Sequence, residues 1–398
     1  MKRRLAQLPL HTGKAPPWLF KRMTKLAGAV TAAIVEEFGP EEMLRRLSDP
    51  WWFQAFGCAL GFDWHSSGVT TVTCGALKEA AKTLGGDLGI VVAGGKGAAS
   101  RKTPAEIDDA ANRLAIEDGQ QLIHASRMSA KVDSAAVQDG FQIYHHSFFF
   151  IAGGPWCVVQ QGMNEQSGWA RRYHWLGETV DDFVCEPHAA IQDLTGRRSE
   201  SRGERTTVLN MVAAEADANR RGSAELVCED PVWLLQEAER LTEGPTLFAP
   251  QQHFVLKTDV NMKRLKKIIV NAHEKHPEDF QTLLGYQGVG PATIRSLSLL
   301  AEVIFQAPPS HRDPVDPPPA GTGRRDETRD VMSDDARRWA DYSYAHGGKD
   351  GTPFPVDRET YDRNIDVLNE AIRRARVGEN DKFNALRRLS NLEAEDGN

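Results

Sequence analysis

Two apolar runs separated by glycines are the clearest pattern in the middle of the chain. Residues 141–151 and 155–161 are rich in aromatic and β-branched side chains, and a Gly-Gly pair at 153–154 lies between them. This arrangement is typical of a β-hairpin. A further strand is expected at 88–93, where an apolar run ends at a glycine-rich loop, and a shorter one at 69–73, where β-branched residues cluster.

Helical patterns dominate most of the remaining sequence. Asp49 and Pro50 have the chemistry of a helix N-cap and first turn, and Thr103 and Glu106 have the spacing of a capping box. Helices are expected in a segment ending near 38, from 50 onward, and at 76–84, 105–118, 119–138, 211–219, 232–240, 257–275, 361–375 and 380–392. The combination predicts a mixed α/β (α+β) body, whose sheet contains the hairpin, followed by a mostly α-helical C-terminal region.

The segment 280–300 predicts two helices joined by a tight turn. An apolar stretch runs into Gly285, Gly288 and Gly290 form the turn, and Pro291 opens the next helix. The turn resembles the helix-hairpin-helix element of DNA-repair and recombination proteins, in which backbone N–H groups and a helix N-terminus hold a nucleic-acid phosphate. An ordinary corner between two helices is the alternative interpretation.

Residues around this turn bear on nucleic-acid attraction and on which repair reactions the turn could support. Gln287 stands where the usual motif has a proline. Ala292 stands where many DNA glycosylases carry a lysine, which excludes a lyase that uses that lysine. Asp313 or Asp316 follows at a loosely comparable distance to their catalytic aspartate, so a glycosylase-like repair enzyme is kept as a weaker alternative. The basic residues expected to attract nucleic acid before the turn are Lys263, Arg264, Lys266 and Lys267.

Length and charge set limits on the organisation of the chain. Its 398 residues suffice for two or three domains. A formal net charge of −7 means that nucleic acid would be bound by local patches and not by an overall positive field. We expect an α/β catalytic body at 1–245, a helical DNA-binding region at 246–316, a flexible insertion at 317–341, and a C-terminal loop with helices at 342–398 that pack back on the body.

Cysteine usage and hydropathy bear on the cellular compartment. The five cysteines include no Cys-x-x-Cys pair, which is typical of reduced thiols in a cytosolic protein. Polar residues interrupt the N-terminal segment before it could serve as a signal peptide. No apolar run approaches the roughly 20 residues that a spanning helix requires. The sequence therefore predicts a soluble, cytoplasmic protein with no membrane partner.

Polar and ionisable residues crowd the hairpin and its flanks. If 141–151 is a regular strand, Gln142, Tyr144 and His146 share one face and His145 lies on the other. A single histidine in a strand is usually structural. Burying several such groups without partners would cost on the order of 1–3 kcal/mol each, which favours an active or binding site. The candidate catalytic residues are Asp63, His65, Asp139, His146, Gln160 and His174.

These residue types would suit phosphodiester hydrolysis. That reaction needs a divalent metal or a His/Lys pair, together with cations for the developing charge. Candidate ligands for Mg²⁺ or Mn²⁺ are Asp63, Asp139 and His146. Arg171 and Arg172 would clamp a phosphate. Carboxylates are nevertheless sparse here, and the carboxylate-x-Lys signature of the common nuclease fold is absent.

Two Gly-Gly-Lys loops are a further candidate for anion binding. Residues 94–102 follow an expected strand and precede an expected helix, a context that suits a phosphate held by backbone amides, Lys96 and Arg101. For the second loop, which contains Lys349, a simple turn is an equal alternative. Neither loop has Walker spacing, so ATP binding is not favoured. A nucleotide-handling enzyme built on both loops is the weakest functional hypothesis.

Several uncommon strings occur together along the chain. They are HTGKAPPWL (11–19), FDWHSSG (62–68), GGKG (94–97), YHH (144–146), VVQQGMN (158–164), ARRYHW (170–175) and HGGKDG (346–351). Together they closely resemble the bacterial and archaeal family catalogued as domain of unknown function 763. The resemblance spans nearly the whole chain, with 317–341 as an insertion. It implies a single body with a C-terminal hairpin-helix element and a role in DNA transactions, but it assigns no catalytic residues.

Two functional hypotheses follow from these features. The first is a metal-dependent endo- or exodeoxyribonuclease of DNA repair or recombination, which cuts at the hairpin and holds its substrate at Gly288 and Gly290. The second is a non-catalytic DNA-binding adaptor, which would explain the missing nuclease signature. The expected cofactor is Mg²⁺ or Mn²⁺. The expected partner is structure-specific or single-stranded DNA, and a homodimer is left open.

Overall fold

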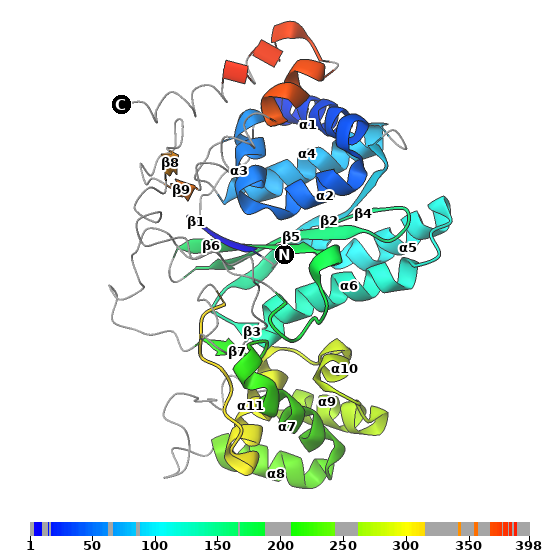
Figure 1. Ribbon diagram of the computed structural model, residues 1–398. Coiled ribbons are helices and arrows are strands. Elements are labelled where there is room, and N and C mark those ends of the chain that lie inside the picture. The colour runs from blue at the N-terminus through cyan, green and yellow to red at the C-terminus, as the bar shows by residue number, and fades with distance from the viewer. Residues whose placement is uncertain are drawn as a thin grey trace, which may run out of the picture.

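One antiparallel sheet lies between two groups of helices, and a further helical region lies below them in Figure 1. The computed structural model describes residues 4–9, 15, 17–62, 67–84, 88–165, 168–187, 208–242, 262–314, 341–343, 354–356, 367–375, 377–380, 382–383 and 386–387. None of the described helices combines the length and the hydropathy needed to cross a membrane.

The sheet contains the predicted hairpin at its centre. Its strand order is β1-β6-β5-β4-β2, and every neighbouring pair is antiparallel. The strands are β1 (Arg4–Pro9), β2 (Ile90–Lys96), β4 (Gln142–Ile151), β5 (Trp156–Asn164) and β6 (Trp169–Leu176). Strands β4 and β5 confirm the hairpin prediction, and β2 confirms the strand expected at 88–93.

Helices α1 to α4 cover one face of the sheet, at the top of Figure 1. They are α1 (Pro17–Phe38), α2 (Pro40–Ser48), α3 (Pro50–Ala59) and α4 (Gly68–Leu84). Their apolar side chains form a buried cluster with sheet residues such as Phe149 and Cys157. Helix α3 starts as predicted, because the Asp49 carboxylate accepts a 3.2 Å hydrogen bond from the N–H of Trp52.

The opposite face is covered by α5 (Thr103–Leu114) and α6 (Gly119–Lys131), and α6 continues into a π turn, η3 (Val132–Ala136). One buried cluster extends from Phe148 on the sheet through Met128 on α6 to Leu283 and Leu297 in the lower helices. Those helices are α7 (Asp217–Cys228), α8 (Pro231–Thr242), α9 (Met262–Lys275), α10 (Phe280–Gly285) and α11 (Pro291–Phe305).

Several short elements lie between or after these helices and strands. A 3-10 segment, η2 (Gly97–Lys102), follows β2, and another, η4 (Gly177–Thr179), follows β6. A third, η6 (Ala214–Ala216), precedes α7. Strand β3 (Val137–Gln138) pairs with β7 (Leu209–Asn210), and β8 (Asp341–Ser343) pairs with β9 (Phe354–Val356).

Two local predictions are wrong for physical reasons. The β-branched run 69–73 belongs to helix α4, because Val69, Thr70 and Thr73 are buried on the inner face of that helix. The capping box at the start of α5 does not form. Thr103 instead donates a 2.7 Å bond to the carbonyl of Ser100, and Glu106 turns to Lys78. Strands β1 and β6 were not expected from the sequence.

The fold class is confirmed as a mixed α/β body with a hairpin-containing sheet, followed by a mostly helical C-terminal region. The expected insertion at 317–341 lies outside the described residues, except for Asp341 in β8. The domain boundaries and the helix-hairpin-helix identity of the segment 280–305 stay predictions.

Candidate functional site

The three central strands of the sheet change character along their length. One end is apolar and contains Phe148, Val158 and Trp175. At the other end the antiparallel register aligns His146 with Gln160, and Gln160 with Tyr173. Polar residues on three strands therefore meet inside the molecule. The buried polar members of this end are His145, His146, Gln160, Gln161, Arg171, Arg172 and His174.

The polar end divides between the two faces of the sheet. His146 contacts α6, whereas the partners of Arg172 lie on the α1–α4 side. His145 is aligned with Gln161, and Gln161 with Arg172, so His145 lies on the α1–α4 side and the prediction that His145 and His146 point to opposite faces is confirmed. The prediction that Tyr144 shares a face with His146 is wrong. A register shift between Ile143 and His145 turns Tyr144 to the other side, where its hydroxyl accepts a hydrogen bond from Gln161.

A chain of hydrogen bonds connects α6 with the sheet. The Ser126 hydroxyl lies 2.9 Å from Nε2 of His146, and Nδ1 of His146 lies 2.8 Å from Oε1 of Gln160. Since an amide oxygen can only accept, Nδ1 carries the proton and Nε2 accepts from Ser126. The Gln160 amide donates to Asp133, which also accepts a 2.9 Å bond from the indole of Trp175.

This chain has the connectivity of a hydroxyl activated by an imidazole, but it lies in the core. Ser126 is 2% exposed and His146 is 4% exposed. Burial lowers the pKa of His146 to about 4, so the imidazole is neutral at neutral pH. A nucleophile needs a substrate within reach, and the burial of Ser126 prevents that contact in this conformation. The arrangement fixes the register of α6 against the sheet.

Arg171 is the centre of a separate ionic group on this face. Its guanidinium donates a 2.6 Å bond to Asp139 and two bonds, of 3.1 and 3.0 Å, to the carboxylate of Asp313. The Tyr173 hydroxyl donates to Asp139 at 2.9 Å, and the ring of Phe141 lies 4.6 Å from the guanidinium carbon. Burial alone would lower the pKa of Arg171, but the carboxylates of Asp313 and Asp139 raise it above its ordinary value.

Arg172, the next residue, is buried against neutral groups. It donates to Nε2 of His174 at 2.8 Å, to Oε1 of Gln54 at 3.0 Å and to the carbonyl of Pro50 at 3.1 Å. The ring of Phe53 lies 4.7 Å from its guanidinium carbon. Burial is the main cause that lowers the pKa of Arg172. This side chain therefore connects β6 to the start of α3 without a carboxylate.

A second polar group lies on the same face beside Arg172. Gln161 accepts from Thr70 at 2.5 Å and donates to the carbonyl of Ser67 at 3.0 Å. His145 lies 3.1 Å from the Ser147 hydroxyl through Nε2, and its buried Nδ1 has no hydrogen-bond partner in the described structure. Burial lowers the pKa of His145 to about 3, with smaller effects from His146 and Lys96. His145 is therefore neutral at neutral pH.

The predicted catalytic and metal-binding residues fall into three situations. Asp139 and His146 belong to separate hydrogen-bonded groups, and His174 is buried on the other face, where its Nδ1 donates to the carbonyl of Leu47 at 2.8 Å. Asp63 and His65 lie outside the described residues. Within the described part of the chain, no three His, Cys, Asp or Glu side chains gather as they would around a metal ion.

The first glycine-lysine loop is closed by an internal carboxylate. Glu106 accepts a 2.7 Å bond from the N–H of Gly94 and a 2.6 Å bond from Lys78. The Gly94 amide is thus not free for an anion. Lys96 and Arg101 are exposed, and the Lys96 ammonium lies 5.8 Å from the ring centre of Tyr144. Lys349 of the second loop lies outside the described residues.

Lys131, the last residue of α6, is hydrogen-bonded to the turn between α10 and α11. Lys131 donates to the carbonyl oxygens of Tyr286, at 2.9 Å, and Val289. The C=O and N–H of a trans peptide unit point in opposite directions. The N–H groups of Gln287 and Gly290 are therefore directed away from Lys131. Burial lowers the pKa of Lys131 to about 8, so it is mainly charged at neutral pH.

Further contacts fix this turn relative to the body. Gln138 donates to the carbonyl of Pro291 at 3.0 Å and accepts two bonds from Arg295, at 2.9 and 2.7 Å. Gly288 has φ of +91°, which glycine adopts without strain. A Cβ built on Gly288 would lie 3.4 Å from Ile268, so α9 packs beside the turn. On α9, Lys267 is exposed, whereas the side chain of Lys263 lies outside the described residues.

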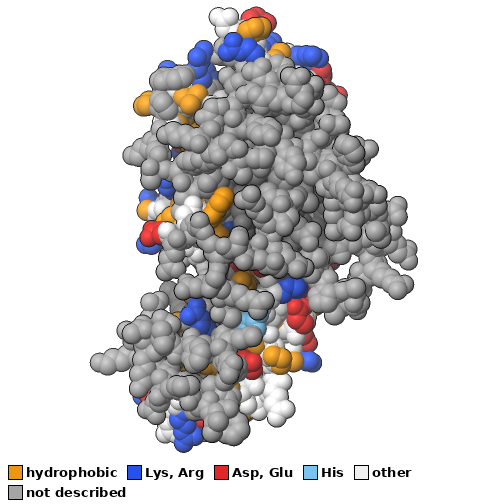
Figure 2. Space-filling view, turned by 90° about the vertical axis from the view of Figure 1, so that its left-hand side faces the viewer, with side chains coloured by type: hydrophobic (Ala, Val, Ile, Leu, Met, Phe, Trp, Pro, Cys, Tyr) orange, Lys and Arg blue, Asp and Glu red, His pale blue; other side chains and the backbone are white. Residues whose placement is uncertain are grey.

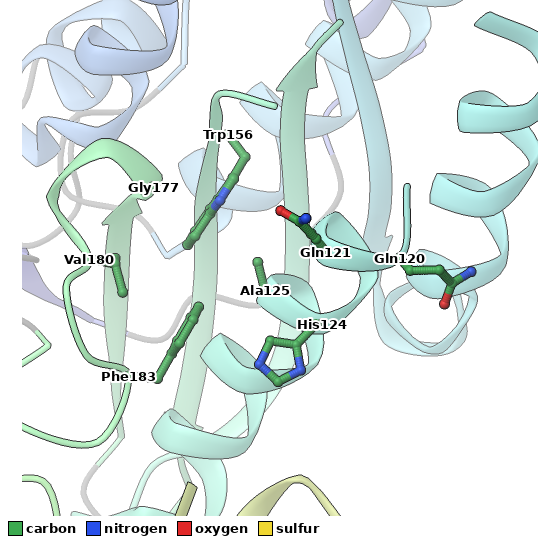
Figure 3. A pocket seen from close by; sticks show the side chains of 8 residues that line it. All are labelled: Gln120, Gln121, His124, Ala125, Trp156, Gly177, Val180 and Phe183. Carbon is green, nitrogen blue, oxygen red and sulfur yellow. The ribbon is translucent and has the colours of Figure 1, made fainter. Parts of the chain in front are cut away.

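An open pocket of about 460 Å³ lies at the other end of α6 (Figure 3). Trp156 and Phe183 form one wall, with ring planes only 4° apart and ring centres separated by 6.2 Å. Gln121 and His124 of α6 lie on the opposite side. Sequence reasoning missed this pocket, because its aromatic and polar members come from segments far apart in the chain. It also missed Lys131, which stands in no recognisable motif.

Comparisons with known proteins support one assignment. A family model described as "Protein of unknown function (DUF763)" matches residues 4–356. Neither a curated protein nor a solved structure matches the chain.

Proposed function

The chain belongs to this family of proteins of unknown function, DUF763, and we propose from the geometry of its own residues that it binds DNA by the phosphate backbone. The contact is made at the turn between α10 and α11. The observation that carries the proposal is the pair of hydrogen bonds from Lys131 to the carbonyls of Tyr286 and Val289. These bonds draw the oxygens of the turn inward and leave its amide face outward.

The start of α11 supplies additional donors for an anion. Ala292, which is only half-buried, lies in the first turn, where a helix has no internal acceptor for its N–H groups. The aligned peptides of this 15-residue helix place partial positive charge at the same point. Gly290 precedes Pro291 without a side chain, so a phosphate oxygen can approach the backbone closely. Together with the N–H of Gly290, these groups resemble the phosphate grip expected from the sequence.

The charge distribution favours local attraction. Lys267 is exposed on α9, and the Lys275 ammonium lies 5.0 Å from the ring centre of Tyr286 at the turn. Glu278 and Asp279 lie before α10 and oppose these cations, so the number of phosphates held should be small. On the face that Figure 2 shows, the described Lys and Arg side chains occur in separate small groups. We therefore expect moderate affinity with a shallow salt dependence.

Replacement of two glycines tests the proposal. A Cβ at Gly290 would lie 3.8 Å from the nearest protein atom, and one at Gly285 would lie 3.7 Å from Met128. Both sites therefore accept alanine without a clash inside the protein. We expect Gly290→Ala to weaken binding of fluorescent single-stranded and duplex DNA by about tenfold, because a charge-assisted hydrogen bond is lost or lengthened. Gly285→Ala serves as the matched control and should bind as the wild type does.

The outcome is decisive if both variants have the wild-type melting temperature. Equal DNA affinity for Gly290→Ala, Gly285→Ala and the wild type would remove the turn from the binding site. Absence of DNA binding by the wild type at about 50 mM salt, where phosphate contacts are strong, would contradict the proposal as a whole.

DNA cleavage is a second candidate, favoured by the gathering of polar side chains at one end of the sheet. Its test is incubation of branched, single-stranded and duplex DNA with Mg²⁺ or Mn²⁺. A nuclease would release products with the wild type, and Asp139→Asn or His146→Gln would abolish them while leaving DNA binding intact. Binding without product would favour the non-catalytic adaptor, and cleavage by both variants at the wild-type rate would remove these residues from the mechanism.

A further inference from the structure

The pocket at the start of α6 has one flat aromatic wall. Trp156 is fixed in place because it stacks on Phe148, with ring centres 5.5 Å apart, and packs against the backbone of Gly177. A Cβ at Gly177 would lie 2.6 Å from the indole, so no larger residue fits there without displacing the ring. Phe183 extends the wall in a nearly parallel plane. The wall therefore presents a preformed surface for stacking.

The opposite side of the pocket carries hydrogen-bonding groups. Figure 3 shows Gln121 extending toward Trp156, whereas Gln120 points away from it. The His124 ring meets Phe183 edge to face, with ring centres 5.9 Å apart and planes at 89°. A planar ligand stacked on the aromatic wall would thus place its edge beside the amide and imidazole groups. Flat faces with donors and acceptors around the edge are the chemistry of a nucleobase.

One exposed stripe of α6 connects this pocket with the turn between α10 and α11. Gln120, His124, Arg127 and Lys131 follow one another at helical spacing, and the first three are exposed. Arg127 lies between the pocket and Lys131, and it makes no ion pair with any described residue. The rise from His124 to Lys131 is about 10 Å. That distance equals about three base steps of axial rise in stacked duplex DNA, and an unstacked strand, whose phosphates lie farther apart, covers it in fewer nucleotides.

We propose that the pocket binds one unstacked base of single-stranded DNA, with the backbone of that strand following α6 past Arg127 to the turn. This inference rests on the proposed DNA binding. The base stacks on Trp156 and Phe183 and meets Gln121 with its edge. Arg127 contacts a phosphate between the two sites, and the turn holds the next phosphates. Duplex DNA engages the turn and leaves the pocket empty.

The test compares natural single-stranded DNA with the same strand lacking its bases. We expect the wild type to bind the natural strand about tenfold more tightly, because base–aromatic stacking contributes that order of affinity. Phe183→Leu and Gln121→Ala should bring the two affinities close together. Gly290→Ala should weaken both strands by the same factor. Gln142→Ala is the control, since Gln142 is exposed on β4 about 26 Å along the strand from the pocket end.

The results separate failure of the pocket from failure of DNA binding. Phe183 packs in the protein, so Gln121→Ala keeps the test valid if Phe183→Leu is unstable. A wild-type affinity that is equal for both strands, or a preference that survives in both pocket variants, overturns the pocket while the grip at the turn stands. If DNA does not bind at all, the wild type is titrated with free adenosine. Adenosine binding that Gln121→Ala abolishes would keep the base pocket and reject the phosphate site at the turn. Absence of adenosine binding would reject both sites.

Discussion

The buried polar end of the sheet and the exposed stripe of α6 use polar residues in opposite ways. At the sheet, Arg171 and His146 are 2% and 4% exposed, and the hydrogen bonds that they make go to other protein groups. On α6, Arg127 and Gln121 are exposed beside a pocket and a turn. The first region has satisfied most of its hydrogen bonds internally, whereas the second offers its groups to solvent.

Reactive residue types therefore do not by themselves mark a functional site. Histidine and arginine pairs in a strand suggest chemistry, but here they connect layers of the fold. We therefore expect substitutions in the sheet to reduce stability and leave DNA affinity unchanged. Substitutions along α6 and the turn should do the reverse. Four measurements test this expectation.

The largest effect is expected for Arg171→Met. Removing the guanidinium leaves the Asp139 carboxylate buried without its cation, which typically lowers the free energy of unfolding by about 3–5 kcal/mol. Urea denaturation measures the loss. Arg45→Met is the control, because Arg45 makes a similar two-bond pair with Glu178, at 2.8 and 2.9 Å, but on the surface. There we expect about 0–1 kcal/mol. Equal losses would contradict a special role for the buried pair.

Acid should destabilise the protein through His146. Burial lowers its pKa from 6.5 to about 4 on folding, so the unfolded chain binds more protons between these values. Stability from this group is complete above pH 6.5 and is lost as the pH falls toward 4, by on the order of 3 kcal/mol. Comparison of urea denaturation curves from pH 7 to pH 4.5 measures this loss of stability. His146→Gln should reduce this slope without removing it, because burial also lowers the pKa of His145, and an unchanged slope would contradict the assignment.

Arg172→Met should cost less than Arg171→Met. The partners of Arg172 are neutral, so its removal leaves unsatisfied acceptors on Gln54 and Pro50 but no unpaired charge. A loss of about 1–3 kcal/mol is expected. The two single variants, measured in the same urea series, form the comparison. A larger loss for Arg172→Met would show that neutral acceptors stabilise the buried guanidinium better than carboxylates do.

The smallest free-energy change is expected for Lys131→Met, and it should appear in the free energy of DNA binding. Losing the two bonds under the turn should weaken DNA binding by about tenfold, or roughly 1.4 kcal/mol. Since burial lowers the pKa of Lys131 to about 8, wild-type affinity should fall between pH 7 and pH 9 as the ammonium loses its charge. The variant should lack that fall. Lys82→Met, at an exposed position on α4, is the control; an identical pH profile in all three proteins would exclude Lys131.

Much of the fold follows from local pattern. Hairpin strands β4 and β5 were predictable because aromatic and β-branched residues flank a Gly-Gly turn. Strand β6 was not predictable, because its Arg-Arg-Tyr-His segment has the composition of an exposed loop. Its polar side chains are buried only because partners from α2, α3, η3 and the segment after α11 reach them. Those partners are distant in sequence, so no local window contains the information.

The candidate site was less predictable than the fold. Gly288 and Gly290 were recognisable from their spacing, since the turn needs backbone conformations that glycine provides. Lys131 lies 155 residues from the carbonyl of Tyr286 that it binds, and only the packing of α6 on α10 brings them together. The face of Tyr144 was mispredicted for a related reason, because a register shift is a property of two paired strands. Spacing within one segment identifies a turn, but not what holds it.

The π turn at Val132–Ala136 places one additional residue between α6 and β3. Each residue advances a helix by about 100°, so this insertion sets the angular phase between Lys131 and Gln138, the two residues that hold the α10–α11 segment. Deleting Ser134 would restore regular winding and carry Gln138 away from Pro291. The pocket end of α6 lies upstream and would keep its place. A single-codon deletion would therefore separate the two proposed contacts without removing any residue from either.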